Sequence, residues 1–137
     1  MKILIAEDNQ VSLRMLEKNL KDWGFNAYKA SDGKKAWDLM QKHKIRIAIM
    51  DWLMPGLNGI DLCKKIRKNL NDRYTYIILL TSKDNTEDVI EGLMAGADDY
   101  IIKPFNPLEL KARLQTGRRI IRLETELLLT HRRLHTL

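Results

Sequence analysis

IRIAIMDWLMPGLNG, residues 45–59, is the stretch that decides the predicted fold. Ile45, Ile47 and Ile49 alternate with other side chains, which is typical of a β-strand, and a Pro-Gly turn closes the run. Asp51 stands just before that turn. In open α/β sheets ligands bind outside the carboxyl ends of the strands. Asp51 is therefore the best candidate for a reactive group.

The rest of the chain alternates between predicted strands and helices. Apolar runs predict further strands at residues 3–6, 25–30, 74–82 and within 96–105. Helical spacing predicts helices over 13–23, around 36–40, over 59–70, over 86–94 and from Pro107 onward. Val89, Ile90 and Leu93 form the apolar side of the fourth helix. Five strands alternating with five helices predict an α/β fold with a doubly wound parallel sheet in the order 2-1-3-4-5.

Composition excludes several classes of protein. A length of 137 residues with 45% hydrophobic and 31% charged residues is typical of one soluble globular domain. Cys63, the single cysteine, excludes an internal disulfide and lies on the apolar face of a helix. No apolar run approaches the roughly 20 residues that span a bilayer, and the N-terminus does not resemble a signal peptide. We therefore expect a cytoplasmic protein without a membrane partner.

The C-terminal helix is longer than the domain needs. Leu110 and Leu114 can pack on the sheet, which places the domain at residues 1–116 and a helical extension at 117–137. In the extension, an apolar seam with alternating spacings of three and four follows the a and d positions of a coiled coil, and consists of Ile120, Leu123, Leu127, Thr130, Leu134 and Leu137. Ile121 and Leu128 widen this seam. The seam favours pairing with another helix, as a linker or dimerisation segment, over the alternative of a solvated charged helix.

Polar side chains follow four of the predicted strands. Glu7 and Asp8 follow the first strand, Asp51 the third, Thr81 the fourth and Lys103 the fifth. The parallel topology brings these strand ends to one edge of the sheet. Three converging carboxylates repel one another unless a cation lies among them, and hard oxygen ligands suit Mg²⁺. Lys103 supplies a movable positive charge on the other side.

These residues resemble the receiver domain of two-component response regulators over about residues 2–114. The likeness rests on an acidic pair, a phosphoacceptor pattern DxxMPxxxG, a switch hydroxyl, a switch aromatic residue and a KPF corner, which match Glu7-Asp8, residues 51–59, Thr81, Tyr100 and Lys103-Pro104-Phe105. The resemblance implies a flavodoxin-like receiver fold with an extended last helix.

The resemblance also implies a role for each site residue. Asp51 would take a phosphoryl group from a histidine kinase or phosphotransfer protein and form an acyl phosphate. Asp8, Asp51 and the backbone carbonyl of Leu53 would hold Mg²⁺, with Glu7 acting through a water. Lys103 would pair with a phosphoryl oxygen.

Signal transmission would involve two further residues. Thr81 would hydrogen-bond the new phosphoryl group and draw in the loop before the fourth helix, and Tyr100 would rotate from solvent toward the core. The fourth helix, the fifth strand and the fifth helix would form the readout surface. The peptide bond between Lys103 and Pro104 is cis in the family.

Other functions fit the sequence less well. A phosphatase of the haloacid dehalogenase type needs a second aspartate where this chain has Leu53, so we expect a signalling domain and not an enzyme. Direct binding of nucleic acid is not expected, although Lys111 and the residues after it carry seven basic side chains against two acidic ones within a net charge of +6. The tail resembles linkers that lead into diguanylate cyclases, so a fragment of such a regulator is the alternative.

Six other residues carry no assigned chemistry. His43, His131 and His135 have no metal-ligand spacing with other candidate ligands and are interpreted as surface residues. Trp52 either borders the site or packs against the domain, and Tyr74 and Tyr76 start a strand without belonging to a motif.

Overall fold

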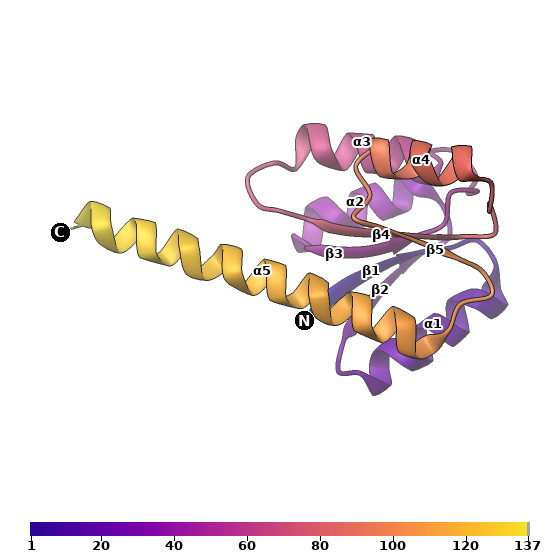
Figure 1. The fold of residues 1–137 in the computed structure, drawn as a ribbon, viewed down its shortest axis with the longest axis horizontal. Coiled ribbons are helices and arrows are strands. Elements are labelled where there is room, and N and C mark those ends of the chain that lie inside the picture. Colours follow the sequence, from indigo (N-terminus) through magenta and orange to yellow (C-terminus); the bar gives the residue numbers. More distant parts are fainter. Residues whose placement is uncertain (137) are drawn as a thin grey trace.

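The structure, a computed structural model, describes residues 1–136. Within these residues the strands are β1 (Lys2–Ala6), β2 (Asn26–Ala30), β3 (Ile47–Met50), β4 (Tyr76–Thr81) and β5 (Asp99–Ile102). The helices are α1 (Gln10–Asp22), α2 (Gly33–His43), α3 (Gly59–Asn69), α4 (Thr86–Met94) and α5 (Pro107–Thr136). The strands pair in parallel in the order β2-β1-β3-β4-β5, which confirms the predicted sheet (Figure 1).

The sheet lies between two layers of helices. Helices α1 and α5 cover one face, and α2, α3 and α4 cover the other (Figure 1). In β3 the side chains of Ile47 and Ile49 belong to the core beneath α1 and α5, whereas Ala48 and Met50 belong to the opposite core. The alternation that predicts this strand therefore distributes apolar side chains to two cores, because the strand is buried on both faces.

Helix α4 leaves most of its apolar side uncovered. Its bounds agree with the prediction, but the side chains of Ile90 and Leu93 are 55% and 45% exposed. The residue that α4 buries is Gly92, where an added Cβ would lie 2.8 Å from side-chain atoms of Leu79 and Tyr100. The glycine lets the helix backbone approach β4 and β5 closely, so apolar side chains are not needed to fill that contact.

Helix α5 is one continuous helix that runs past the domain, and its far end lies well beyond the sheet (Figure 1). Leu110 and Leu114 are buried as predicted, but Ile121 is also buried in the core beneath α1 and α5. The assignment of Ile121 to the seam is therefore wrong, because this side chain faces the domain.

Of the other described seam residues, Leu128 is half-buried and the rest are exposed. The exposed fractions are 37% for Ile120, 52% for Leu123, 69% for Leu127 and 68% for Leu134. Leu137 of the predicted seam lies outside the described residues. None of the helices found in residues 1–136 combines the length and apolar character needed to cross a membrane.

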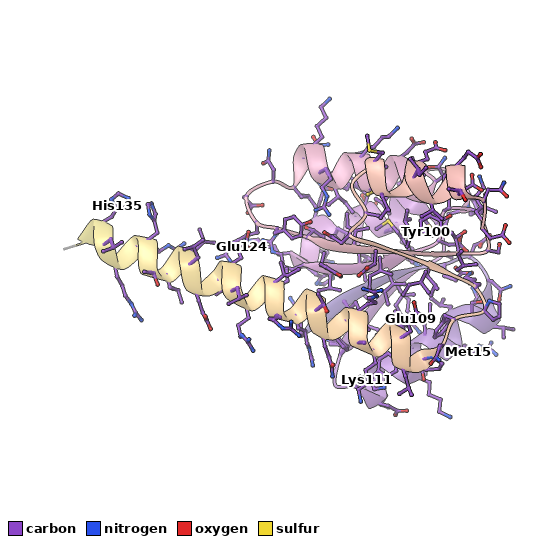
Figure 2. The ribbon with its side chains drawn as sticks, in the orientation of Figure 1. Met15, Tyr100, Glu109, Lys111, Glu124 and His135 are labelled. Carbon is purple, nitrogen blue, oxygen red and sulfur yellow. The ribbon has the colours of Figure 1, made fainter. Side chains whose placement is uncertain are left out.

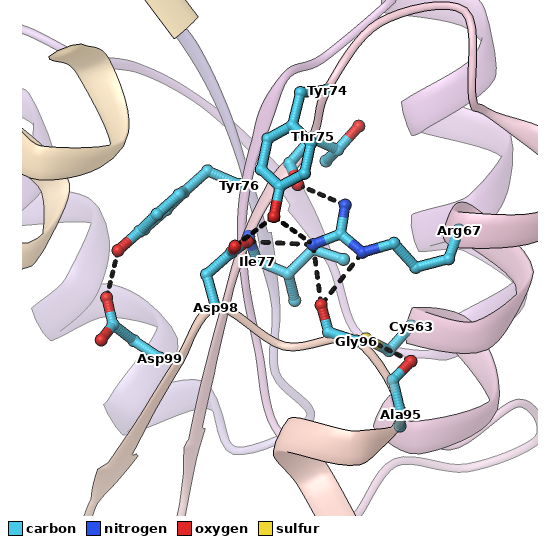
Figure 3. Close-up of polar contacts among 10 residues, drawn as sticks. All are labelled: Cys63, Arg67, Tyr74, Thr75, Tyr76, Ile77, Ala95, Gly96, Asp98 and Asp99. Carbon is cyan, nitrogen blue, oxygen red and sulfur yellow. Dashed lines mark hydrogen bonds and ion pairs between the residues drawn. The ribbon is translucent and has the colours of Figure 1, made fainter. Parts of the chain in front are cut away.

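A polar cluster ties together the sheet edge opposite to the predicted site (Figure 3). The Arg67 guanidinium of α3 donates hydrogen bonds to the carbonyl oxygens of Thr75 (2.6 Å) and Gly96 (2.7 and 3.0 Å) and pairs with the Asp98 carboxylate at 2.9 Å. The Tyr74 hydroxyl donates to the same carboxylate (Figure 3). Arg67 thus joins α3 to the segments that start β4 and β5.

The same edge also holds α5. The backbone N–H of Tyr74 donates to the Glu124 carboxylate at 2.8 Å, and the Tyr76 hydroxyl donates to Asp99. An added Cβ on Gly117 would lie 2.7 Å from the Tyr76 ring. Helix α5 is therefore held to the start of β4 as far as Glu124, beyond the last residues that were expected to pack on the sheet.

Candidate functional site

The predicted site residues meet at the carboxyl edge of the sheet, because the parallel ladder continues beyond the formal strand ends. The backbone N–H of Asp51 donates to the carbonyl of Ala6 at 2.9 Å, and that of Lys103 donates to the carbonyl of Thr81 at the same distance. The first bond holds Asp51 beside the end of β1, and the second holds Lys103 beside the end of β4 at the same edge. The Lys103–Pro104 peptide bond is cis, as expected.

Lys103 bridges two buried carboxylates. Its Nζ lies 2.8 Å from Oδ2 of Asp51 and 3.0 Å from Oε2 of Glu7. Glu7 is 2% exposed and Asp51 is 8% exposed. Burial of two like charges is costly, and a single ammonium within hydrogen-bond distance of both offsets part of that cost. The cluster keeps one more negative than positive formal charge when both carboxylates are ionised.

Their different surroundings push the two carboxylates toward different protonation states. Burial, together with a hydrogen bond to Asp51, raises the pKa of Glu7 to about 7. Burial also acts to raise the pKa of Asp51, but hydrogen bonds to Lys103, Glu7 and Thr81 outweigh it and lower that pKa. Asp51 is therefore the carboxylate that stays ionised, which is the form a nucleophile requires.

Asp8 lies on the solvent side of the same edge. It is exposed, and it shares a surface pocket of about 450 Å³ with Trp52 and Leu53, the two residues that follow Asp51. The Leu53 side chain is 54% exposed, and its backbone N–H donates to Oδ1 of Asp51 at 3.1 Å. An open pocket lined by an acidic side chain thus adjoins the buried carboxylates.

The donor chemistry of this edge fits Mg²⁺. Carboxylate oxygens of Asp8 and Asp51 and the carbonyl of Leu53 are hard oxygen ligands, and Mg²⁺ usually takes one or two protein carboxylates and keeps several waters. Within the described part of the chain, no three His, Cys, Asp or Glu side chains are grouped as metal ligands. Glu7 and Asp51 are turned toward Lys103, which supplies a positive charge at this edge.

The two predicted switch residues lie on either side of the loop that follows β4. Thr81 is fully buried, and its Oγ1 accepts a hydrogen bond from the N–H of Lys83 at 3.4 Å. Tyr100 is half-buried, and its hydroxyl donates to the carbonyl of Lys83 at 2.7 Å. Both residues therefore contact the backbone of Lys83, although no sequence pattern links this lysine to Tyr100.

Trp52 is buried at this loop. It is 6% exposed and lies edge-on to Tyr100, with ring centroids 6.5 Å apart. The Nζ of Lys83 lies 4.2 Å from the centroid of the Trp52 ring and 3.8 Å from the Asp88 carboxylate. Both interpretations of Trp52 hold, because it lines the pocket beside Asp8 and is also buried in the core beneath α2, α3 and α4. The Lys83 side chain rests on this ring through a cation–π contact.

Comparisons with known proteins agree with this arrangement. A family model described as the response regulator receiver domain matches residues 3–115. The regulatory protein VanR of Enterococcus faecium is 44% identical over 115 residues, which cover 83% of this chain and 48% of VanR. Protein RcaC of Microchaete diplosiphon is 41% identical over 116 residues, which cover 84% of this chain and 17% of RcaC. The chain thus spans about half of VanR and less than a fifth of RcaC.

Solved structures show the same fold. The receiver domain of the Francisella response regulator 1452 is 36% identical with a TM-score of 0.80, and the match covers 86% of this chain and 96% of that domain. The chemotaxis protein CheY4 of Vibrio cholerae is 32% identical with a TM-score of 0.78, and the match covers 85% of this chain and 97% of CheY4. Sequence, sheet order and relatives lead to one conclusion: this chain belongs to the response regulator receiver domain family of two-component signal transduction.

Proposed function

We propose that Asp51 of this receiver domain is the phosphoacceptor. The observation that carries the proposal is the pairing of the buried Asp51 carboxylate with Lys103 Nζ at 2.8 Å beside an open, acid-lined pocket. The partner would be a histidine kinase or a histidine phosphotransfer protein, because a phosphohistidine is the donor that the family uses. We expect this exchange to take place in the cytoplasm.

The chemistry requires little beyond positioning and charge. A carboxylate oxygen of Asp51 attacks the phosphorus of the donor phosphohistidine, and the bond between phosphorus and nitrogen breaks with its electron pair left on the imidazole. Lys103 already contacts Asp51, so it can pair with an entering phosphoryl oxygen without a large movement. Asp8, Asp51 and the Leu53 carbonyl would hold Mg²⁺, with Glu7 acting through a water. When bound, Mg²⁺ supplies charge neutralisation for the phosphoryl oxygens.

The consequence of phosphorylation would be a change in the loop after β4. A phosphoryl group adds up to about two negative charges beside Asp51. The Thr81 hydroxyl can donate to that group, and a shift of Thr81 toward it would move or break the hydrogen bond that its Oγ1 now accepts from the Lys83 N–H. Tyr100 follows because its hydroxyl bonds the same residue. We propose that α4, β5 and α5 present the resulting change to an output partner.

Replacing Asp51 tests the acceptor assignment. We expect Asp51→Asn to abolish labelling by acetyl phosphate and Mg²⁺, because an amide is neither a carboxylate nucleophile nor a comparable metal ligand. Intact mass spectrometry measures the labelled fraction, and urea unfolding checks that the variant is folded. Asp38→Asn, at an exposed carboxylate on α2, is the matched control and should label as the wild type does. Labelling of Asp51→Asn at the wild-type rate would assign the acceptor elsewhere.

We also propose that residues 117–137 pair with a second copy of the chain. Four apolar side chains of the seam are exposed on the α5 face that does not pack on the domain, and apolar a and d positions are the contacts of a coiled coil. The relatives named above give no support to the diguanylate cyclase alternative. The proposed pairing therefore does not depend on which output module the receiver domain controls.

A charged substitution on the seam tests this pairing. Leu127→Glu should shift the sedimenting species from dimer to monomer, because it places a carboxylate between the two helices. Leu129→Glu is the matched control, since Leu129 is also exposed at 46% but does not belong to the seam. Monomeric wild-type protein across the accessible concentrations, or equal effects of the two substitutions, would refute pairing through the seam.

A further inference from the structure

Two histidines come together near the outer end of α5. His131 and His135 are four residues apart on a continuous helix, so their side chains share one face. Their Nε2 atoms lie 2.9 Å apart, and the ring centroids are 4.2 Å apart with the planes at 85°. Both side chains are exposed, and Figure 2 shows His135 beyond the domain. One ring nitrogen thus donates a hydrogen bond to the other at a position that is open to solvent.

This separation is that of a hydrogen bond between the two rings, and it is also one that a shared metal ion can span. Imidazole nitrogen binds Zn²⁺ at about 2.0–2.1 Å, so two ligands at neighbouring positions, with an angle of about 90° at the metal, lie roughly 2.9 Å apart. A tetrahedral angle would separate them by about 3.4 Å, which small rotations of the two rings can supply. Chelation would replace the hydrogen bond between the rings, whose nitrogens are already close enough to share one ion.

We propose that His131 and His135 chelate one divalent late transition-metal ion, with Cu²⁺, Ni²⁺ and Zn²⁺ as the class. Imidazole suits these ions, whereas carboxylate, carbonyl and water suit Mg²⁺. The histidine pair and the Asp51 edge therefore select different metals. In the sequence, neither histidine has metal-ligand spacing with other candidate ligands. On the helix, however, residues four apart lie one turn apart on the same face, so the two rings can bind one ion together.

The pair forms an open, two-ligand site. Nowhere in residues 1–136 does a third His, Cys, Asp or Glu complete a group of metal ligands. Water would fill the remaining positions, unlike the four protein ligands of a closed structural zinc site. The residue after His131 is Arg132, whereas the zinc protease pattern HExxH has a glutamate there. The site therefore lacks the general base of a hydrolase, and metal binding is the activity that it supports.

Chelation would stabilise the last turns of α5. The two ligands converge only when the residues between them are helical, so metal binding is linked to helix formation there. The ion would act as a staple between successive turns at the free end of the helix. This effect is independent of phosphorylation and of Asp51, so it stands or falls separately from the proposed function.

Titration of the whole, metal-stripped chain with ZnCl₂ and NiCl₂ tests the proposal. Calorimetry should show saturable binding of one ion per chain, unaffected by excess Mg²⁺, and amide hydrogen exchange at residues 128–136 should slow when the ion is present. His131→Gln and His135→Gln should each remove both effects. His43→Gln is the matched control, because His43 stacks on Tyr28 away from α5, and it should retain both.

The results that would overturn the chelate are equally specific. Absence of saturable binding would do so, as would retention of wild-type binding by either tail variant. Loss of binding in His43→Gln alone would place the ion elsewhere. Because both tail histidines are exposed, their replacement should leave the unfolding transition of the domain unchanged, which keeps loss of binding distinct from loss of fold.

Discussion

Replacing Arg67 with alanine should destabilise the domain far more than replacement of an arginine in an ordinary surface ion pair. In the wild type, Arg67 satisfies the carbonyl oxygens of Thr75 and Gly96 and pairs with Asp98 (Figure 3). Arg67→Ala leaves these acceptors without this donor at a partly buried position, where the Arg67 and Asp98 side chains are 26% and 17% exposed. The stem of Arg67 also packs against Gly96, and that contact is lost as well.

The expected loss is about 3 kcal/mol of unfolding free energy. Breaking a buried ion pair typically costs about 3–5 kcal/mol because the remaining charge is left uncompensated. Partial exposure of this pair favours the lower end of that range, since solvent can reach the orphaned groups. For a chain of this length roughly 4 °C of Tm corresponds to 1 kcal/mol, so Tm should fall by about 12 °C.

Urea unfolding followed by circular dichroism measures the difference, with the slope checked for a two-state transition. Arg46→Ala is the matched control, because Arg46 lies 3.8 Å from Asp72 in a pair whose aspartate is 76% exposed. Its loss should cost less than about 1 kcal/mol. If Arg67→Ala costs no more than Arg46→Ala, the cluster does not hold α3 to the starts of β4 and β5 in the way described.

Three glycine-to-alanine changes should lower the free energy of unfolding by amounts that depend on what the added Cβ meets. Urea midpoints, compared at equal slope, measure these losses. Gly59→Ala should cost about 3 kcal/mol, because the new Cβ would lie 2.2 Å from the backbone oxygen of Asp51, which cannot move aside cheaply. Gly117→Ala should cost about 1 kcal/mol, since a clash at 2.7 Å with the Tyr76 ring is partly offset by better helix propensity. Gly24→Ala should also cost about 1 kcal/mol, but through its φ of +85° alone, because nothing lies within 4 Å of its Cβ. A larger loss at Gly24 than at Gly59 would contradict this ranking.

Sequence patterns predicted the sheet because its signals are local. Ile47 and Ile49, together with the turn after Asp51, predict strand β3. The parallel order of the sheet then follows from the alternation of strands and helices along the chain. The Arg67 cluster carries no such signal. Most of its acceptors are backbone oxygens of residues 8 and 29 positions away, so only the closed fold brings them together. Periodicity in turn defined the seam of α5 but could not show that Ile121 faces the domain.

The candidate site likewise has features that the sequence predicted and features that only the folded chain shows. Residue type and spacing alone do not separate the two acidic residues after β1, yet Glu7 is buried against Lys103 whereas Asp8 is exposed beside Leu53. Consecutive residues at a strand end point to opposite sides, so one of the pair had to enter the core edge and the other the pocket. The buried carboxylate is tolerated because Lys103, 96 residues away, contacts it as well as Asp51. Charge balance among these three groups is a property of the folded edge, which explains why the sequence indicated that these residues meet there but not how they pair.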